Sequence, residues 1–267
     1  MPLGIELAAA WVRVFSASEI AAQLREDMES LTTNRRDILE RHRSLQLVFD
    51  HSWRLLTEQE QEVFPKLPVF YSGFRAEAAA AIADASPEIL TSLHAKSFLS
   101  LSSNGRYRIL QPLWQLATKE LTLQPSLWQR LRDRHAAYYT DLAAKHTPDL
   151  WTSRQQAVIR KLAPEIQNIR AAWRWAAERG QIEAVSQTIE FVYRFHRMRG
   201  YFQEGERLFR FVREALETAT ADCSTAELRG TLARLQEGAA MFAFHLSRLA
   251  QARVELEESL AVLEELG

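Results

Sequence analysis

Apolar residues recur along most of the chain at intervals of three and four positions, which is the period of one face of an α-helix. Near the C-terminus the pattern is carried by Leu249, Ala252, Leu256, Leu260 and Leu263. Capping boxes mark several helix starts, because a hydroxyl can accept a backbone N–H while a glutamate three positions later returns to the cap. They begin at Ser16, Thr57 and Ser224. The pattern predicts a mainly α-helical protein.

One stretch departs from the helical period. Residues 97–101 and 106–110 are rich in β-forming side chains, and Ser-Ser-Asn-Gly lies between them. This predicts a β-hairpin. Helices are expected around it at 44–56, 58–67, 75–84, 87–96 and 112–121. A helix-turn-helix followed by a two-stranded wing has this order, so residues 41–121 are expected to form a winged-helix domain with one β-hairpin.

Residues 122–267 are expected to form a helical repeat domain, which is predicted to be helical throughout over 126–266. Breaks fall near Pro148, Gly180, Gly200, Asp222 and Ser247. The segments between them fit an α-solenoid of helical hairpins like those of tetratricopeptide (TPR) arrays, in which each hairpin buries its apolar face against its neighbours. Because the spacing is not a regular 34 residues, a plain helical bundle remains the alternative.

Charge and cysteine content narrow the class of protein. The 33 Lys and Arg residues nearly balance the 34 Asp and Glu residues, which gives a net charge of −1 and no bulk attraction for nucleic acid. Cys223 is the only cysteine in the sequence, so disulfide scaffolds and multi-cysteine zinc sites are excluded. No apolar run approaches the roughly 20 residues of a membrane helix. We expect a cytoplasmic protein without a membrane partner.

No catalytic or metal-binding constellation stands out. A helical zinc site requires two histidines four positions apart with a carboxylate beside them. None of the seven histidines belongs to such a pair. The Gly-x-x-x-x-Gly-Lys sequence that cradles phosphates is missing. We therefore expect no enzyme activity, no metal and no cofactor in this chain.

The balance of cations and anions in residues 41–121 indicates whether this segment could bind DNA. The segment 87–96 offers only His94 and Lys96 as possible cations, and the predicted wing adds Arg106 and Arg108. Across residues 41–119, nine cations face seven anions. This balance is weak support for a phosphate-binding surface. We do not expect DNA as a partner, and a DNA-binding winged-helix module is the alternative function.

A run of aromatic and basic residues over 191–199 is the strongest candidate for a partner surface, since aromatics and arginine are enriched at binding hot spots. The alternative is that the aromatics pack in the core while the arginines are solvated. The candidate partner-binding residues are Tyr193, Arg194, Arg197, Arg199 and Tyr201.

Several stretches together resemble one protein family. Residues 2–10 look like the Gly-Leu-Pro-Leu segment that closes the nucleotide-binding module of STAND (NB-ARC-like) NTPases. Residues 41–61 and 70–74 resemble the winged helix that follows, as do residues 105–110. Residues 171–176 and 199–201 resemble its helical repeats. The chain is most similar to bacterial transcriptional regulators of the LuxR and AfsR type.

This resemblance implies a non-catalytic regulatory fragment of a signalling ATPase. Residues 1–40 would be a helical remnant of the NTPase module, the winged helix an intramolecular clamp on that module, and the repeats the binding site for a protein partner or inducer. ATP or ADP would bind the parent protein, with Pro2 near the adenine. The positions of the family's Met-His-Asp sensor are occupied by Ile109, Leu110 and Gln111, so no imidazole is available there to sense phosphate.

Overall fold

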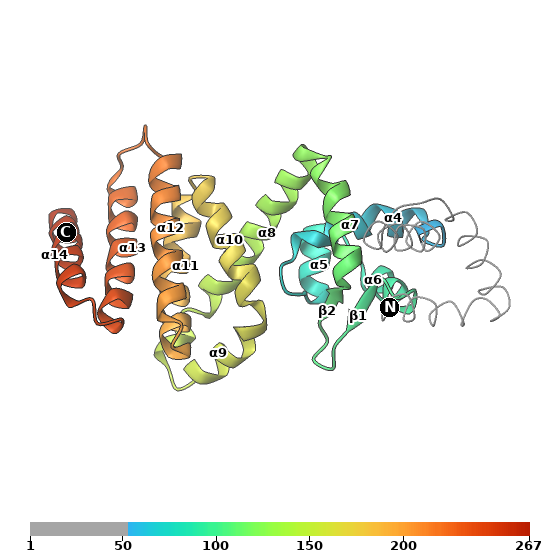
Figure 1. The fold of residues 1–267 in the computed structure, drawn as a ribbon, viewed down its shortest axis with the longest axis horizontal. Helices are drawn as coiled ribbons and strands as arrows, with labels where there is room; N and C mark the ends of the chain where they lie inside the picture. Colours follow the sequence, from blue (N-terminus) through green and yellow to red (C-terminus); the bar gives the residue numbers. More distant parts are fainter. Residues whose placement is uncertain (1–52) are drawn as a thin grey trace, which may run out of the picture. The chain divides into compact units, whose positions relative to one another are not determined.

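The computed structural model describes residues 53–267 (Figure 1). The expectations for residues 1–40, for Pro2 and for most of the helix at 44–56 lie outside the described residues. The described part is mainly helical and contains one two-stranded antiparallel hairpin, which confirms the predicted fold class. The described chain divides into two units, residues 53–69 with 73–128 and residues 70–72 with 129–267.

The first unit combines short helices with the hairpin. Its helices are α4 (Glu58–Val63), the 3₁₀ helix η1 (Phe64–Val69), α5 (Ala76–Ala83), α6 (Pro87–Ala95) and α7 (Gln111–Thr122). Strands β1 (Leu99–Leu101) and β2 (Tyr107–Ile109) pair with Leu99 opposite Ile109 and Leu101 opposite Tyr107. From residue 58 on, the order of three α-helices, the hairpin and a further α-helix is the one that the sequence predicted.

Local chemistry explains where these helices begin. The Thr57 hydroxyl accepts the Glu60 N–H at 3.3 Å, and the Thr57 N–H donates to the Glu60 carboxylate at 2.7 Å, so the predicted capping box forms. Ser86 caps α6, with Pro87 in the first turn. The helix predicted over 58–67 was too long. It changes to 3₁₀ geometry at Phe64 because Pro65 and Pro68 cannot donate a backbone hydrogen bond.

The core of the first unit is built from aromatic and aliphatic side chains that are at most 1% exposed. They come from η1, the segment before α5, α5, α6 and the residue preceding β1. These side chains are Phe64, Leu67, Val69, Phe74, Ile82, Leu90, Leu93 and Phe98. They cover the inner faces of the short helices and anchor the hairpin.

The second unit is a succession of longer helices. It contains α8 (Pro125–His146) from residue 129 onward, η2 (Pro148–Trp151), α9 (Gln155–Leu162) and η3 (Ala163–Glu165). These are followed by α10 (Ile166–Glu178), α11 (Ile182–Arg199), α12 (Phe202–Ala219), α13 (Ala226–His245) and α14 (Leu249–Leu266). α12 packs on α10 and α13, and α13 packs on α14, as in a helical solenoid (Figure 1).

The turns between these helices fall at three of the predicted breaks. Gly180, Gly200 and Ser247 adopt left-handed backbone conformations with φ of 65°, 70° and 64°. Glycine takes this conformation without the steric cost that a Cβ imposes, which explains two of the three positions. These residues reverse the chain, so that consecutive long helices lie antiparallel.

Close packing of α12 against α13 depends on two further glycines. A Cβ on Gly205 would lie 2.7 Å from the ring of Phe242, and a Cβ on Gly238 would overlap the ring of Phe209. The Phe209 and Phe242 rings pack edge to face with 5.6 Å between their centroids. Trp173 of α10 joins this aromatic cluster and is fully buried. Small residues opposite large rings thus set the separation of the helices.

Candidate functional site

The five candidate partner-binding residues on α11 and the turn after it divide into two groups. Tyr193 is half-buried and packs against Phe242 and Phe209, with ring centroids 5.2 and 6.4 Å away. Arg194 forms an ion pair with Glu190, and its guanidinium lies 3.4 Å from the centre of the Trp151 ring. These two side chains are engaged within the unit.

The remaining three candidates are exposed at the C-terminal end of α11. Arg197, Arg199 and Tyr201 all face solvent, and Arg199 Nη2 lies 3.5 Å from the Tyr201 hydroxyl. Met198 between them is 39% exposed. We call Arg197, Met198, Arg199 and Tyr201 the α11 end surface. It combines cations with apolar area on a short stretch of chain.

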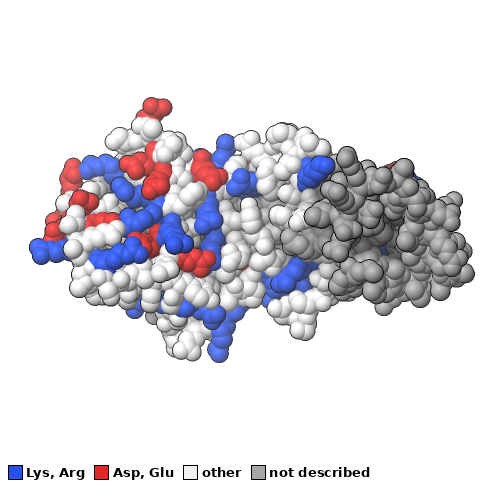
Figure 2. Space-filling model, in the orientation of Figure 1, with Lys and Arg blue, Asp and Glu red and all other residues white. Residues whose placement is uncertain are grey.

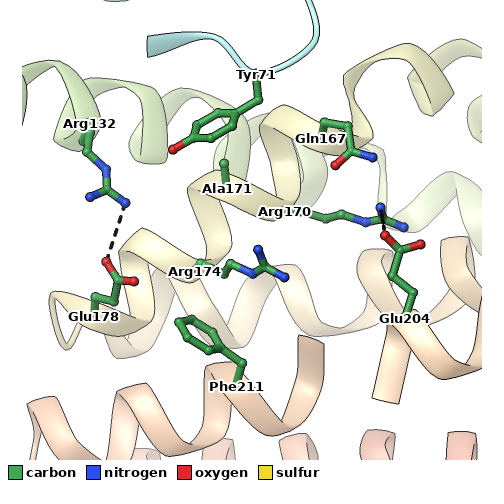
Figure 3. Close-up of a pocket in the computed structure, with 9 residues that line it drawn as sticks. All are labelled: Tyr71, Arg132, Gln167, Arg170, Ala171, Arg174, Glu178, Glu204 and Phe211. Atoms are coloured by element: carbon green, nitrogen blue, oxygen red, sulfur yellow. Dashed lines mark hydrogen bonds and ion pairs between the residues drawn. The ribbon is translucent and has the colours of Figure 1, made fainter. Parts of the chain in front are cut away.

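A cavity in the second unit provides a more enclosed site that the sequence did not reveal. Its volume is about 360 Å³, and its lining comes from residue 71 and from α8, α10 and α12. Three arginines contribute to it, Arg132, Arg170 and Arg174 (Figure 3). Because these residues lie up to 42 positions apart, no sequence motif connects them.

Two of these arginines have carboxylate partners. Arg132 Nη2 lies 3.6 Å from Glu178 Oε2, and Arg170 Nη1 forms an ion pair with Glu204. Among the described residues, Arg174 forms no ion pair, and its guanidinium lies 5.4 Å from the centre of the Phe211 ring. The three arginines and two glutamates that line the cavity leave it with one excess positive charge.

Arg170 donates hydrogen bonds to a buried histidine, His196. The His196 side chain is fully buried, and its Nδ1 lies 2.7 Å from the Val192 carbonyl, to which it donates. Nε2 is therefore the acceptor for the Arg170 N–H groups, at 3.0 Å from Nε and 2.8 Å from Nη2. Burial and the charge of Arg170 lower the pKa of His196 to about 4. The neutral imidazole thus fixes the orientation of the Arg170 guanidinium group.

Tyr71 is positioned at the cavity by a second buried polar group. The Tyr71 N–H donates to Asn168 Oδ1 at 2.8 Å, and the Ser72 hydroxyl donates to the Pro164 carbonyl at 3.2 Å. His135 packs against Tyr71 with ring centroids 6.1 Å apart. Burial lowers the pKa of His135 to about 4. Residues 70–72 therefore belong to the second unit through specific hydrogen bonds.

The possible DNA-contacting cations of the first unit are largely engaged in structure. Lys96 donates to the buried Glu60 carboxylate at 2.6 Å and to the Leu55 carbonyl at 3.0 Å. Arg106 is 6% exposed and donates to the Gly73 carbonyl at 2.8 Å. Treating Arg106 as a wing cation was wrong, because its side chain points into the unit. Arg108 and His94 remain exposed.

The surface of the second unit shows mixed charge. In Figure 2, Lys and Arg side chains alternate with Asp and Glu over α10–α14. Within residues 53–267, no group of three or more His, Cys, Asp or Glu side chains is arranged to hold a metal ion.

None of the helices in the described range is both long and apolar enough to cross a membrane.

Comparisons with known proteins give one consistent likeness. No family model and no solved structure matches the chain. It is 34% identical over 237 residues, 82% of its length, to "Putative HTH-type transcriptional regulator Mb0914c" of Mycobacterium bovis and to "Putative HTH-type transcriptional regulator Rv0890c" of Mycobacterium tuberculosis. The chain spans about a quarter (26%) of the length of these curated relatives. The observed similarity is therefore to a segment of bacterial transcriptional regulators.

Proposed function

We propose that this chain is a regulatory segment of a transcriptional regulator, with the second unit as the part that receives the signal. The observation that carries the proposal is the arginine-lined cavity of that unit, which has an excess positive charge and one arginine without an ion pair among the described residues. The names of the similar mycobacterial proteins supply the regulatory context. Cavities of about 300–1,000 Å³ are typical of small-molecule sites.

In this proposal the first unit acts as an intramolecular clamp on an NTPase module of the STAND type, and ATP or ADP binds that module. The exposed side chains of α6 include Glu88, Thr91 and His94, which form no cationic surface. A helix-turn-helix unit without such a surface is better suited to protein contact than to phosphate contact. The α11 end surface is the proposed contact for a protein partner.

Two experiments test this function. Calorimetry with ATP and ADP on the present chain, and on a chain extended N-terminally by the proposed NTPase module, should show binding only in the extended chain. In the full-length regulator, replacing Arg197 and Arg199 together by Glu should alter reporter transcription in response to its signal. An unchanged response would argue against the α11 end surface as a regulatory contact, and tight nucleotide binding by the short chain would refute the clamp role.

DNA binding by the first unit is the second candidate. It is favoured by the printed name of the similar proteins, which describes helix-turn-helix-type regulators. That name makes DNA a partner to be tested, contrary to the expectation from the balanced charge of residues 41–119. Of the cations considered for DNA contact in the predicted wing, Arg108 is exposed on β2 and Arg106 is not.

Fluorescence anisotropy with labelled duplex DNA at low salt distinguishes the two candidates. Binding that weakens steeply with added salt, and that Arg108→Ala reduces while Arg253→Ala does not, would support DNA contact by the hairpin. Arg253 is a suitable control because it is exposed on α14 and paired with Glu257. Absence of binding at low salt would place DNA reading outside this chain.

A further inference from the structure

The cavity of the second unit brings together two kinds of recognition group. Arg170 and Arg174 project toward it from α10, and Arg132 comes from α8 (Figure 3). Tyr71 and Phe211 lie on opposite sides of the same space in Figure 3. Both aromatic side chains are well exposed, at 52% and 40%. Cations and uncovered rings therefore face one volume of about 360 Å³.

One cation of this cavity, Arg170, is held in place before any ligand arrives. The Arg170 side chain is only 6% exposed, and the buried His196 acceptor sets its orientation. Burial lowers the pKa of Arg170, with Arg174 adding to the effect and Glu204 opposing it. An anion beside these guanidinium groups would relieve their mutual repulsion. Because Arg170 is already ordered, its side chain would lose little conformational entropy on binding an anion.

The carboxylates at the cavity would not prevent an anion from binding. The Glu204 and Glu178 side chains are 53% and 38% exposed. Water competes with the arginines for these exposed carboxylates, so the ion pairs contribute less net free energy than fully buried pairs would. Arg174 has no such pair among the described residues, so its guanidinium can donate two hydrogen bonds to a phosphate or carboxylate without breaking an existing ion pair.

We propose that this cavity binds a small organic anion, whose phosphate or carboxylate group contacts Arg174 and Arg170 and whose planar ring packs against Phe211. The inference deepens the proposed function, because such a ligand would be the signal that the second unit receives. The inference rests on the proposed function only for the biological role of the ligand. Binding itself follows from the charge, the rings and the volume of the cavity.

The test is calorimetric titration of the full 267-residue chain at low salt with three probes: phenyl phosphate, inorganic phosphate and phenol. Phenyl phosphate should bind with a dissociation constant on the order of 1 mM or below. The other two probes should bind at least about tenfold more weakly, because each lacks one of the two recognition elements. Added salt should weaken the phenyl phosphate interaction.

Matched variants assign the binding to this cavity. Arg174→Gln should weaken phenyl phosphate by about tenfold or more, since it removes charge-assisted hydrogen bonds to the anion. Phe211→Ala should reduce the preference for phenyl phosphate over inorganic phosphate. Arg253→Gln, which removes an exposed arginine of α14, should leave the affinity unchanged. Thermal unfolding of each variant checks that the chain remains folded.

Each result decides the question. No binding of phenyl phosphate at millimolar concentration and low salt would overturn the site. So would binding that Arg174→Gln leaves intact, or that inorganic phosphate reproduces equally well. If phenyl phosphate binds as expected while Arg174→Gln in the full regulator leaves its transcriptional response unchanged, the site stands and the regulatory role fails.

Discussion

The Nε2 atom of His196 lies 3.0 Å from Nε and 2.8 Å from Nη2 of Arg170, and both residues are buried. A neutral imidazole on α11 thus accepts from a cation on α10. Protonation of His196 would place two positive charges in contact. The hydrogen bonds between Arg170 and His196 therefore form only while His196 is neutral. The same network orients a guanidinium that lines the cavity, so helix packing and the candidate site depend on one protonation state.

Acid should destabilise the second unit before carboxylates titrate extensively. Burial lowers the pKa of His196 and His135 to about 4 in the folded chain, whereas an unfolded histidine titrates near 6.5. Between these values the unfolded chain binds more protons, so the free energy of unfolding falls as the pH drops from about 6.5 toward 4. The expected loss approaches about 3 kcal/mol per histidine. Urea unfolding at several pH values measures it.

The control for this pH effect is His196→Gln. Its amide oxygen can still accept from Arg170, but the side chain does not titrate. The variant should lose stability at pH 7.5 and show a shallower decline between pH 6.5 and 4. An equally steep decline in the variant would remove His196 as the cause.

Gly238→Ala should destabilise the second unit by about 1–3 kcal/mol, because the added methyl group overlaps the Phe209 ring in a filled core. Gly230→Ala on the same helix is the matched control. Its Cβ would meet only Leu266 Cδ1 at 3.6 Å. Alanine is the better helix former, so Gly230→Ala should be neutral or stabilising by up to about 1 kcal/mol. Thermal and urea unfolding compare the pair, and equal effects would contradict the packing described for α12 and α13.

Arg106→Ala should act on the stability of the first unit. The side chain is buried and donates to the Gly73 carbonyl, next to the backbone bridge between Phe74 and Tyr107. Loss of a charged hydrogen bond of this kind costs about 1.5–3 kcal/mol. Arg108→Ala, the exposed neighbour on β2, should change stability by less than about 0.5 kcal/mol. Hydrogen exchange at the hairpin amides would report the difference, and similar protection in both variants would count against a structural role for Arg106.

Asn168→Ala should weaken the attachment of residues 70–72 to the second unit. The Asn168 side chain is fully buried and accepts the Tyr71 N–H. Removing it leaves that donor unsatisfied, at a cost of about 1–3 kcal/mol. Gln167→Ala is the neighbouring control, since Gln167 is exposed, and it should be close to neutral. Faster proteolysis near Tyr71 in Asn168→Ala but not in Gln167→Ala is the expected readout.

Local sequence determined most of the secondary structure. Thr57 with Glu60 predicted a helix start, Asn104 with Gly105 predicted the hairpin turn, and Gly180 and Gly200 predicted helix ends, because capping and left-handed turns depend on neighbouring residues alone. Residues two positions apart on a helix face different sides, as Trp173 and Trp175 do on α10. Trp173 is buried against Phe209, and Trp175 lies beneath Arg132 and donates to Asp133.

Only the tertiary structure decided which polar residues meet. The sequence could not show that Arg106 points inward, that Tyr193 packs against Phe242, or that Arg132 shares a cavity with Arg174 and Phe211. Periodicity assigns a residue to a helix face, but it does not identify the helix that the face meets. The cavity arises where α8, α10 and α12 pack together with Tyr71, so its chemistry depends on contacts between residues far apart in the chain.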